Sequence, residues 1–323
     1  MRMRARVQTT VLAGALLCLL LVAGCGGEET GGTGAPERAA EVRAFVSIPP
    51  QAQFVERVGG DHVQVGILVK PGHSPHTYEP TPRQMTELAE AGVYFLIGVP
   101  FEDILKERIR SANPDMAMVD TGRGIELREM ETHHTHGKAE EHEHEEQEHE
   151  EHKHGEHDDH EGRKDPHVWL DPANVGVMAG HIAEALVEQD PEHEADYRAN
   201  LEEFRAELDR LDARIRESLE GLEQREILVF HPAFGYFTDA YGLEQVPIEI
   251  EGKEPGAKAL SELISFAKQR GIKVVFVQKQ FSSKTAQVVA REIDGQVVPL
   301  DPLARDYVGT MEDIAEAFAE ALR

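Results

Sequence analysis

The sequence predicts an α/β protein with two lobes, each built on a parallel four-stranded sheet, and one long helix between them. Two observations predict the lobes: short runs rich in Val, Ile and Phe alternate with helical segments, and this pattern occurs twice along the chain. The third observation is a helical stripe of apolar residues between the two occurrences. A chain of 323 residues is long enough for such a core.

The predicted N-terminal lobe spans residues 41–171 and contains four strands and three helices. A Pro near the start of the first helix and Gly59-Gly60 after its end are typical helix boundaries. The expected strands are 42–48, 63–69, 93–98 and 116–119, and the expected helices are 50–58, 83–91 and 101–111.

The predicted helical linker spans residues 172–222. Within 191–222, apolar residues recur every three or four positions, at Tyr197, Leu201, Phe204, Leu208, Leu211, Ile215, Leu219 and Leu222. About 30 residues at ~1.5 Å each give a helix of roughly 45 Å. A free coiled coil is an alternative, but it needs more heptads and a partner helix. We therefore expect a spine that lies along both lobes.

The predicted C-terminal lobe, residues 223–323, has the same alternation of strands and helices as the N-terminal lobe, but no sequence repeat is visible. Its strands are expected at 227–230, 245–250, 273–277 and 296–300, and its helices at 260–270, 284–293 and 311–322.

The first 40 residues are interpreted as an export signal and a tether. Arg2, Arg4 and Arg6 precede an apolar run that is short for a membrane span and ends in Leu-Val-Ala-Gly-Cys25. This ending resembles a bacterial lipobox, so we expect cleavage after residue 24, lipidation of Cys25 and a membrane-anchored protein outside the cytoplasmic membrane. An ordinary secretory signal with an incidental Cys is the alternative. Residues 25–40, rich in Gly, Thr and Glu, are expected to form a flexible tether.

The net charge of −27 disfavours a nucleic-acid partner, which would require clustered Lys and Arg. Residues 126–165 alone hold 16 acids and 5 bases. With 17 His and 2 Cys in the chain, metal chemistry would use imidazole and carboxylate ligands.

An acidic segment at about residues 130–164 contains ten histidines and almost no apolar residue. We expect this loop to be disordered and to bind metal weakly, although a solvated charge run without a role is the alternative. Its histidines are His133, His134, His136, His142, His144, His149, His152, His154, His157 and His160.

Four further residues follow predicted strands directly or after a loop: His76, His167, His231 and Asp301. Open α/β sheets bind ligands beyond the carboxyl ends of their strands. A lone His there is usually a hydrogen-bonded loop residue, but four coincident placements, two from each lobe, indicate a site. If the lobes face each other, three imidazoles and one carboxylate converge in the cleft, as a tetrahedral Zn²⁺ site requires.

Several tracts resemble the metal-binding solute-binding lipoproteins of ABC importers, especially the high-affinity zinc-uptake branch. They are 75–82, 165–172, 231–237 (HPAFGYF), 251–255 (EGKEP) and 301–303, and the likeness extends from about residue 42. The resemblance implies two Rossmann-like lobes joined by one long helix, with metal in the interlobe cleft. The family's ligand positions fall on His76, His167 and His231. Some relatives have an acid before the first ligand, where this chain has Pro75, so the fourth ligand is expected to be Asp301 or a water.

The resemblance and the nitrogen-rich ligands predict a monomeric, non-enzymatic protein that captures Zn²⁺ and delivers it to a membrane permease. Manganese-type relatives have a carboxylate at the third position, and Mn²⁺ prefers oxygen-rich shells, so manganese or another divalent metal is the alternative within the family. A secreted zinc hydrolase, with Glu79 as its base, and a metal-storage lipoprotein are alternatives of other classes. No HExxH or GxSxG motif supports a hydrolase.

Overall fold

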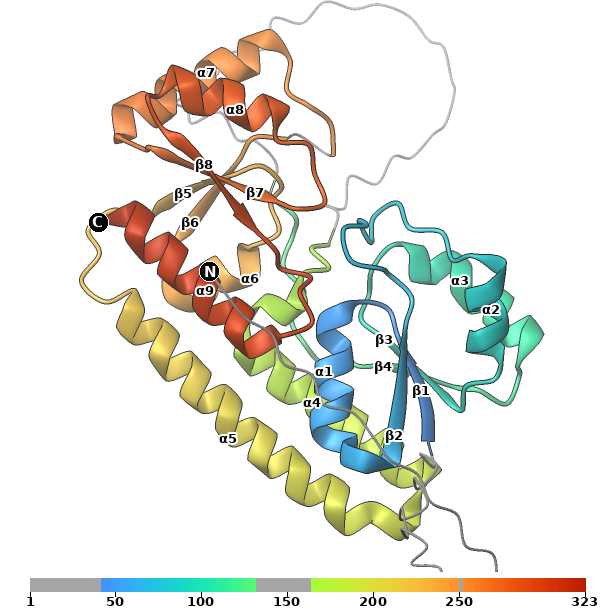
Figure 1. The fold of residues 1–323 in the computed structure, drawn as a ribbon. Coiled ribbons are helices and arrows are strands. Elements are labelled where there is room, and N and C mark those ends of the chain that lie inside the picture. The colour runs from blue at the N-terminus through green and yellow to red at the C-terminus, as the bar shows by residue number, and fades with distance from the viewer. Residues whose placement is uncertain (1–41, 132–163, 250–251) are drawn as a thin grey trace, which may run out of the picture. The chain divides into compact units, whose positions relative to one another are not determined.

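Two parallel sheets of four strands each form the framework of the computed structural model, which describes residues 42–131, 164–249 and 252–323. The strand order is β2-β1-β3-β4 in the first sheet and β6-β5-β7-β8 in the second (Figure 1). The two orders are equivalent: in each sheet, the second strand in the chain pairs with one side of the first strand, and the third pairs with its other side. The predicted α/β class with two parallel four-stranded sheets is confirmed.

Helices lie on both sides of the first sheet in Figure 1, which explains its apolar strands. All four side chains of β3 are buried. Thr81 and Gln84 form a capping box that starts α2, just after the loop that carries His76. The elements are β1 (Val42–Val46), α1 (Pro49–Gly59), η1 (Gly60–His62), β2 (Val63–Ile67), α2 (Pro82–Ala89), β3 (Val93–Leu96), α3 (Phe101–Ala112) and β4 (Ala117–Asp120).

The second sheet buries its two faces in different clusters because successive side chains of a strand point to opposite sides. In the central strand β7, Phe276 packs in the main core and Val275 and Val277 pack in the smaller cluster under α7 and α8. The elements are β5 (Glu226–Val229), α6 (Gly235–Tyr241), β6 (Glu244–Pro247), α7 (Ala257–Arg270), β7 (Val274–Gln278), α8 (Lys284–Glu292), β8 (Gln296–Leu300) and α9 (Tyr307–Leu322).

The long helix predicted between the sheets is present as α5 (Glu194–Ser218), but it is shorter than expected. Pro191 lies in a separate 3₁₀ turn, η3 (Pro191–His193), and Leu219 and Leu222 are buried beyond the helix end. At ~1.5 Å per residue, its 25 residues span about 38 Å rather than roughly 45 Å. The apolar stripe therefore extends further than the helix that carries most of it.

A second linking helix, α4 (Pro172–Gln189), precedes α5 and follows the short turn η2 (Val168–Leu170). In Figure 1, α4, α5 and α9 lie beside one another, and residues of all three belong to one continuous core. Contacts between α1 and the start of α9 reinforce this arrangement: Gln53 Oε1 accepts a hydrogen bond from Tyr307 N at 2.7 Å, and Arg305 pairs with Glu56. The described residues accordingly belong to one compact unit.

Helix α6 was not predicted, since its sequence (GYFTDAY) lacks the length for a clear 3.6-residue period. Its aromatic side chains Tyr236, Phe237 and Tyr241 are buried, which fixes the helix against the core. Within the described part of the chain, no helix has both the length and the apolarity needed to cross a membrane.

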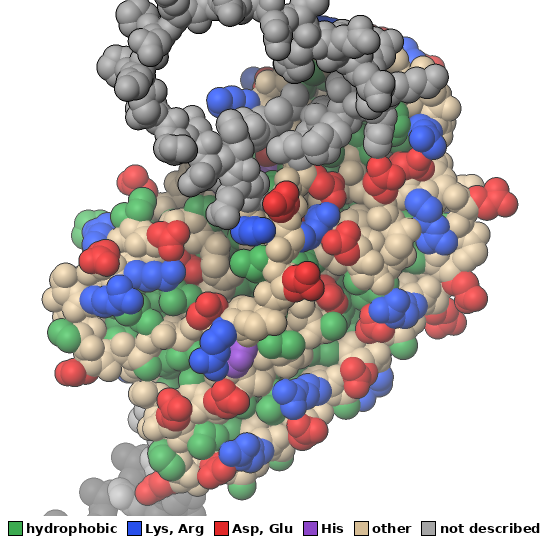
Figure 2. Space-filling view, turned by 180° about the vertical axis from the view of Figure 1, so that it is seen from behind, with side chains coloured by type: hydrophobic (Ala, Val, Ile, Leu, Met, Phe, Trp, Pro, Cys, Tyr) green, Lys and Arg blue, Asp and Glu red, His purple; other side chains and the backbone are tan. Residues whose placement is uncertain are grey.

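Acidic and basic side chains of the described residues are interspersed on the face seen in Figure 2. Several are neighbours along α5, such as the pairs Arg198–Glu194 and Arg216–Asp212. Exposed pairs of this kind stabilise a fold only slightly.

Candidate metal site

His76, His167 and His231 converge at one place, although the first and the last are 155 positions apart in the sequence. One ring nitrogen from each lies within 4.8 Å of the others. The ring centroids are 5.3 Å apart for His76 and His167, 4.9 Å for His76 and His231, and 5.2 Å for His167 and His231. His76 lies in the loop after β2, His167 directly precedes η2, and His231 lies two residues after the end of β5.

His167 is held by a carboxylate two residues earlier in the chain. Asp165 Oδ1 lies 2.7 Å from His167 Nδ1 and accepts a hydrogen bond from the backbone N of His167 at 2.9 Å. Both side chains are buried. Because the carboxylate accepts a hydrogen bond from Nδ1–H, the Nε2 lone pair of His167 faces the centre of the three rings.

His231 is held in the same way by Glu249, which follows β6. Glu249 Oε1 lies 2.5 Å from His231 Nδ1, and both side chains are buried. Gln278 at the end of β7 fixes the backbone, because its Nε2 donates to His231 O at 2.7 Å. Burial lowers the pKa of His231, and the hydrogen bond to Glu249 opposes this shift. A lowered pKa keeps the imidazole neutral, the form that binds metal.

The separation of the two Nε2 atoms fits a tetrahedral metal ion. His167 Nε2 and His231 Nε2 are 3.4 Å apart. Two nitrogens at ~2.05 Å from one zinc ion, at the tetrahedral angle, would be about 3.3–3.4 Å apart. Since both Nδ1 atoms face carboxylates, two lone pairs point toward each other, and a cation between them would relieve the repulsion.

The rings line a cavity of about 20 Å³, which has room for roughly one water-sized particle. Its other walls are mostly apolar. Phe281 stacks on His231 with centroids 4.8 Å apart, and Trp169 lies 5.3 Å from the ring of His167. The lining consists of Ser74, Pro75, His76, His167, Trp169, His231, Ala233, Gln278, Gln280, Phe281, Pro302 and Leu303.

Asp301 does not join the three rings, contrary to the expectation of a carboxylate ligand there. Its oxygens contact Gln280 Nε2 at 3.0 Å, Lys279 Nζ at 3.4 Å and the backbone N of Leu303 at 3.3 Å. The cause is strand order: β8 is separated from β5 by β7, and two strand spacings amount to about 10 Å. A water as fourth ligand remains the other expectation.

Asp165 and Glu249 were not predicted to have roles, although both were visible in the sequence. Asp165 belongs to the tract that carries His167, and Glu249 lies at the end of a predicted strand. His181, within the predicted helical linker, lies in α4, with Nδ1 2.9 Å from Thr121 O. The ten histidines of the acidic loop and Cys25 lie outside the described residues.

Three comparisons with known proteins agree with this geometry. A protein of Bacillus subtilis named as the high-affinity zinc uptake system protein ZnuA is 33% identical over 289 residues, 88% of this chain and 86% of the relative. A crystal structure of ZnuA is 39% identical, with a TM-score of 0.77 over 87% of this chain and 99% of that one. A zinc-bound ZnuA with a deletion of its residues 138–173 is 40% identical, with a TM-score of 0.75 over 87% and 98%.

The family model for zinc-uptake complex component A, a periplasmic protein, matches residues 45–321. This range includes both sheets, both linking helices and all three clustered histidines. The resemblance noted in the sequence is thereby confirmed, and the chain belongs to the family of periplasmic A components of zinc-uptake complexes.

Proposed function

We propose that this protein captures Zn²⁺ outside the cytoplasmic membrane with His76, His167 and His231 and delivers it to an ABC permease. The observation that carries the proposal is the pair of Nε2 atoms 3.4 Å apart, each on a ring whose other nitrogen faces a buried carboxylate. Rings oriented in this way need little further ordering to bind an ion. Zinc is the cargo of such a protein, so the site has to bind it tightly and still release it.

The donor set favours zinc over manganese. Three imidazole nitrogens suit Zn²⁺, whereas Mn²⁺ prefers shells rich in oxygen. Cu²⁺ and Ni²⁺ accept the same nitrogen donors, so the bound element has to be measured.

A transport role, rather than catalysis, follows from membership of the family. The hydrolase alternative would need a base beside the metal. Glu79 is exposed and is not part of the cavity lining, so it does not support that alternative.

The lipid anchor, the monomeric state and the role of the acidic loop belong to the same proposal. The Leu-Val-Ala-Gly-Cys25 sequence supports an anchor on the outer side of the cytoplasmic membrane. Ten histidines among acids support weaker metal sites that collect or buffer zinc. We expect each of those sites to be weaker than the cluster, because ordering a flexible segment costs about 1–2 kcal/mol per backbone residue.

Elemental analysis and calorimetric titration test the proposal. The protein from residue 41 onward is compared with the same chain lacking 132–163 and with His76→Ala, His167→Ala and His231→Ala variants. We expect the deleted chain to retain one tight zinc site and to lose only weaker ones. Loss of the tight site on deletion would contradict the histidine cluster, and unchanged stoichiometry would contradict the loop sites.

A further inference from the structure

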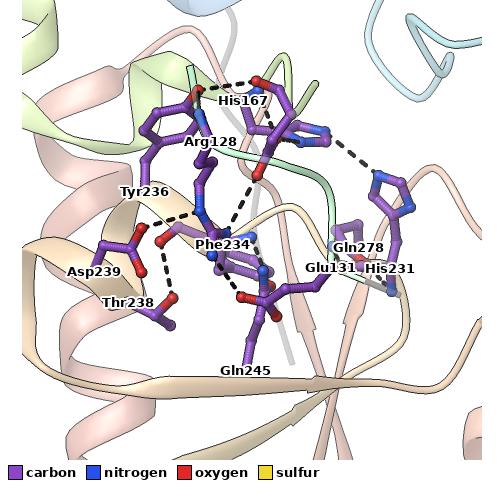
Figure 3. Close-up of polar contacts among 12 residues, drawn as sticks. Arg128, Glu131, His167, His231, Phe234, Tyr236, Thr238, Asp239, Gln245 and Gln278 are labelled. Atoms are coloured by element: carbon purple, nitrogen blue, oxygen red, sulfur yellow. Dashed lines mark hydrogen bonds and ion pairs between the residues drawn. The ribbon is translucent and has the colours of Figure 1, made fainter. Parts of the chain in front are cut away.

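Arg128 is a largely buried guanidinium that faces carboxylates from three parts of the chain. Its side chain is 17% exposed. Nη2 lies 2.6 Å from Glu131, Nε lies 3.0 Å from Asp239 in α6, and Nη1 lies 3.5 Å from Asp165 (Figure 3). Arg128 does not line the cavity, and its ion pairs join it to carboxylates rather than to any of the three clustered histidines.

Asp165 connects Arg128 to the metal site because its two oxygens have different partners. Oδ1 binds the backbone N and Nδ1 of His167, and Oδ2 faces Nη1 of Arg128. The side chain of Asp165 is completely buried. A buried carboxylate needs charged or hydrogen-bonding partners to offset its lost hydration, and Arg128 supplies a positive charge on the side away from His167.

The backbone of Arg128 holds the same region. Arg128 O accepts from Asp165 N at 3.0 Å, and the neighbouring residues Glu129 and Lys164 form an antiparallel bridge. Tyr236 Oη accepts from Arg128 N at 3.2 Å and donates to Asp165 O at 3.1 Å. The segment that contains Arg128 thus fixes residue 165 through both main chain and side chain.

Gly235 leaves the space that the guanidinium occupies. A Cβ atom at this position would lie 1.2 Å from Arg128 Nη1 and 2.9 Å from Asp165 Oδ2. Any larger residue there would therefore displace Arg128 or Asp165. This close approach explains why the HPAFGYF tract has a glycine at position 235.

We propose that Arg128 is a positioning residue of the metal site: it holds Asp165 in the orientation that keeps His167 Nε2 directed at His231 Nε2. The inference rests on the proposed function and deepens it, since Arg128 would not touch the ion. Removal of a partner behind a metal-ligating histidine typically weakens metal binding 10–100-fold. Arg128 acts one step further away, so about a 10-fold loss is expected.

The test measures zinc affinity by competition with a chromophoric chelator for the wild type, Arg128→Met, Asp165→Asn and the double variant. We expect about 10-fold weaker binding for Arg128→Met, a loss of 10–100-fold for Asp165→Asn, and little further loss in the double variant. Arg128→Lys should recover part of the affinity. Arg216→Met is the matched control, because its partners Asp212 and Ala240 lie outside the cavity lining, and it should bind zinc like the wild type.

A measurement on the metal-free protein tests the positioning role of Arg128 separately from the proposed function. Imidazole ¹⁵N chemical shifts of the metal-free protein should report the Nδ1–H tautomer of His167 in the wild type and a mixture in Arg128→Met. Gly235→Ala, whose Cβ would approach both Arg128 Nη1 and Asp165 Oδ2, should also weaken zinc binding. Wild-type affinity and an unchanged tautomer in Arg128→Met would overturn the positioning role, as would additive losses in the double variant. Failure of the wild type to bind zinc would instead overturn the proposed function.

Discussion

Glu102 gives the sharpest prediction about stability, because it is a buried acid in the first turn of α3. Its Oε1 accepts hydrogen bonds from Ile97 N at 2.9 Å and from Ser47 Oγ, and its Oε2 accepts from Gly98 N at 2.8 Å. These groups lie at the carboxyl end of the first sheet, and Ser47 O also accepts from Val69 N, before the loop that carries His76. Burial outweighs these hydrogen bonds and raises the pKa of Glu102 from 4.5 to about 7.

This raised pKa makes the free energy of unfolding depend on pH. Between pH 4.5 and 7 the folded protein binds one more proton at Glu102 than the unfolded chain does. The free energy of unfolding therefore falls as pH rises, by about 1.4 kcal/mol per pH unit inside this window. With these two pKa values, the loss between pH 5 and pH 8 is about 2.5 kcal/mol.

Glu102→Gln removes the titration but keeps the shape. The amide NH₂ must face either Ile97 N or Gly98 N, so the variant should lose one hydrogen bond at every pH, at a cost of about 1–3 kcal/mol. Urea unfolding of the metal-free wild type and variant from pH 5 to pH 8 measures the difference between their unfolding free energies. We expect the unfolding free energy of the wild type minus that of the variant to fall by about 2.5 kcal/mol as pH rises, which reverses its sign where the lost hydrogen bond costs less than this. A constant difference would refute the raised pKa, whereas a parallel change in zinc affinity would show that the effect is not confined to the fold.

Three further predictions concern metal binding. His231→Ala should weaken zinc binding by at least about 100-fold, because it removes one of three ligands. His181→Ala loses only a contact to a backbone carbonyl, so it should change zinc affinity less than about twofold in the same chelator competition. Zinc affinity should decrease when the pH falls below about 6, because protons compete with zinc for the imidazoles; the lowered pKa of His231 shifts this competition to lower pH. Fluorescence of Trp169, which lies beside His167, can follow zinc binding. A flat affinity from pH 7.5 to pH 5 would argue against histidine ligation. A chain that begins at residue 41 should fold and bind zinc without lipid, since the first described element, β1, begins at Val42. Circular dichroism and calorimetry check this, and failure to fold would contradict the tether assignment.

The strands were predictable because each is a short β-branched or aromatic run, and their carboxyl ends identified His76, His167 and His231. Strand order was not predictable from these runs. Glu249 follows β6 and Asp301 follows β8, and of these two strands only β6 is adjacent to β5, which precedes His231. The acid that contacts His231 is therefore Glu249, and Asp301 faces Lys279 and Gln280 instead.

Helix boundaries were less predictable for a related reason: they depend on tertiary contacts. The stripe through Leu219 and Leu222 indicated a longer α5, yet both residues are buried in the connection to β5 after the helix has ended. Burial alone does not distinguish the last turn of a helix from an apolar connection. Helix α6 was missed because its seven residues are held by packing of their aromatic side chains rather than by a periodic pattern.

The 3.4 Å separation at the site depends on contacts that join distant parts of the chain. His167 is oriented by Asp165, whereas His231 is oriented by Glu249 from the second sheet. Trp169 Nε1 donates to Pro302 O at 3.0 Å beside the cavity, which ties the turn after His167 to the segment after β8. The distance between the two Nε2 atoms thus depends on such direct contacts and on how both sheets pack against the core that α4, α5 and α9 share. Zinc affinity should therefore respond to changes in this shared core as well as to changes in the ligands.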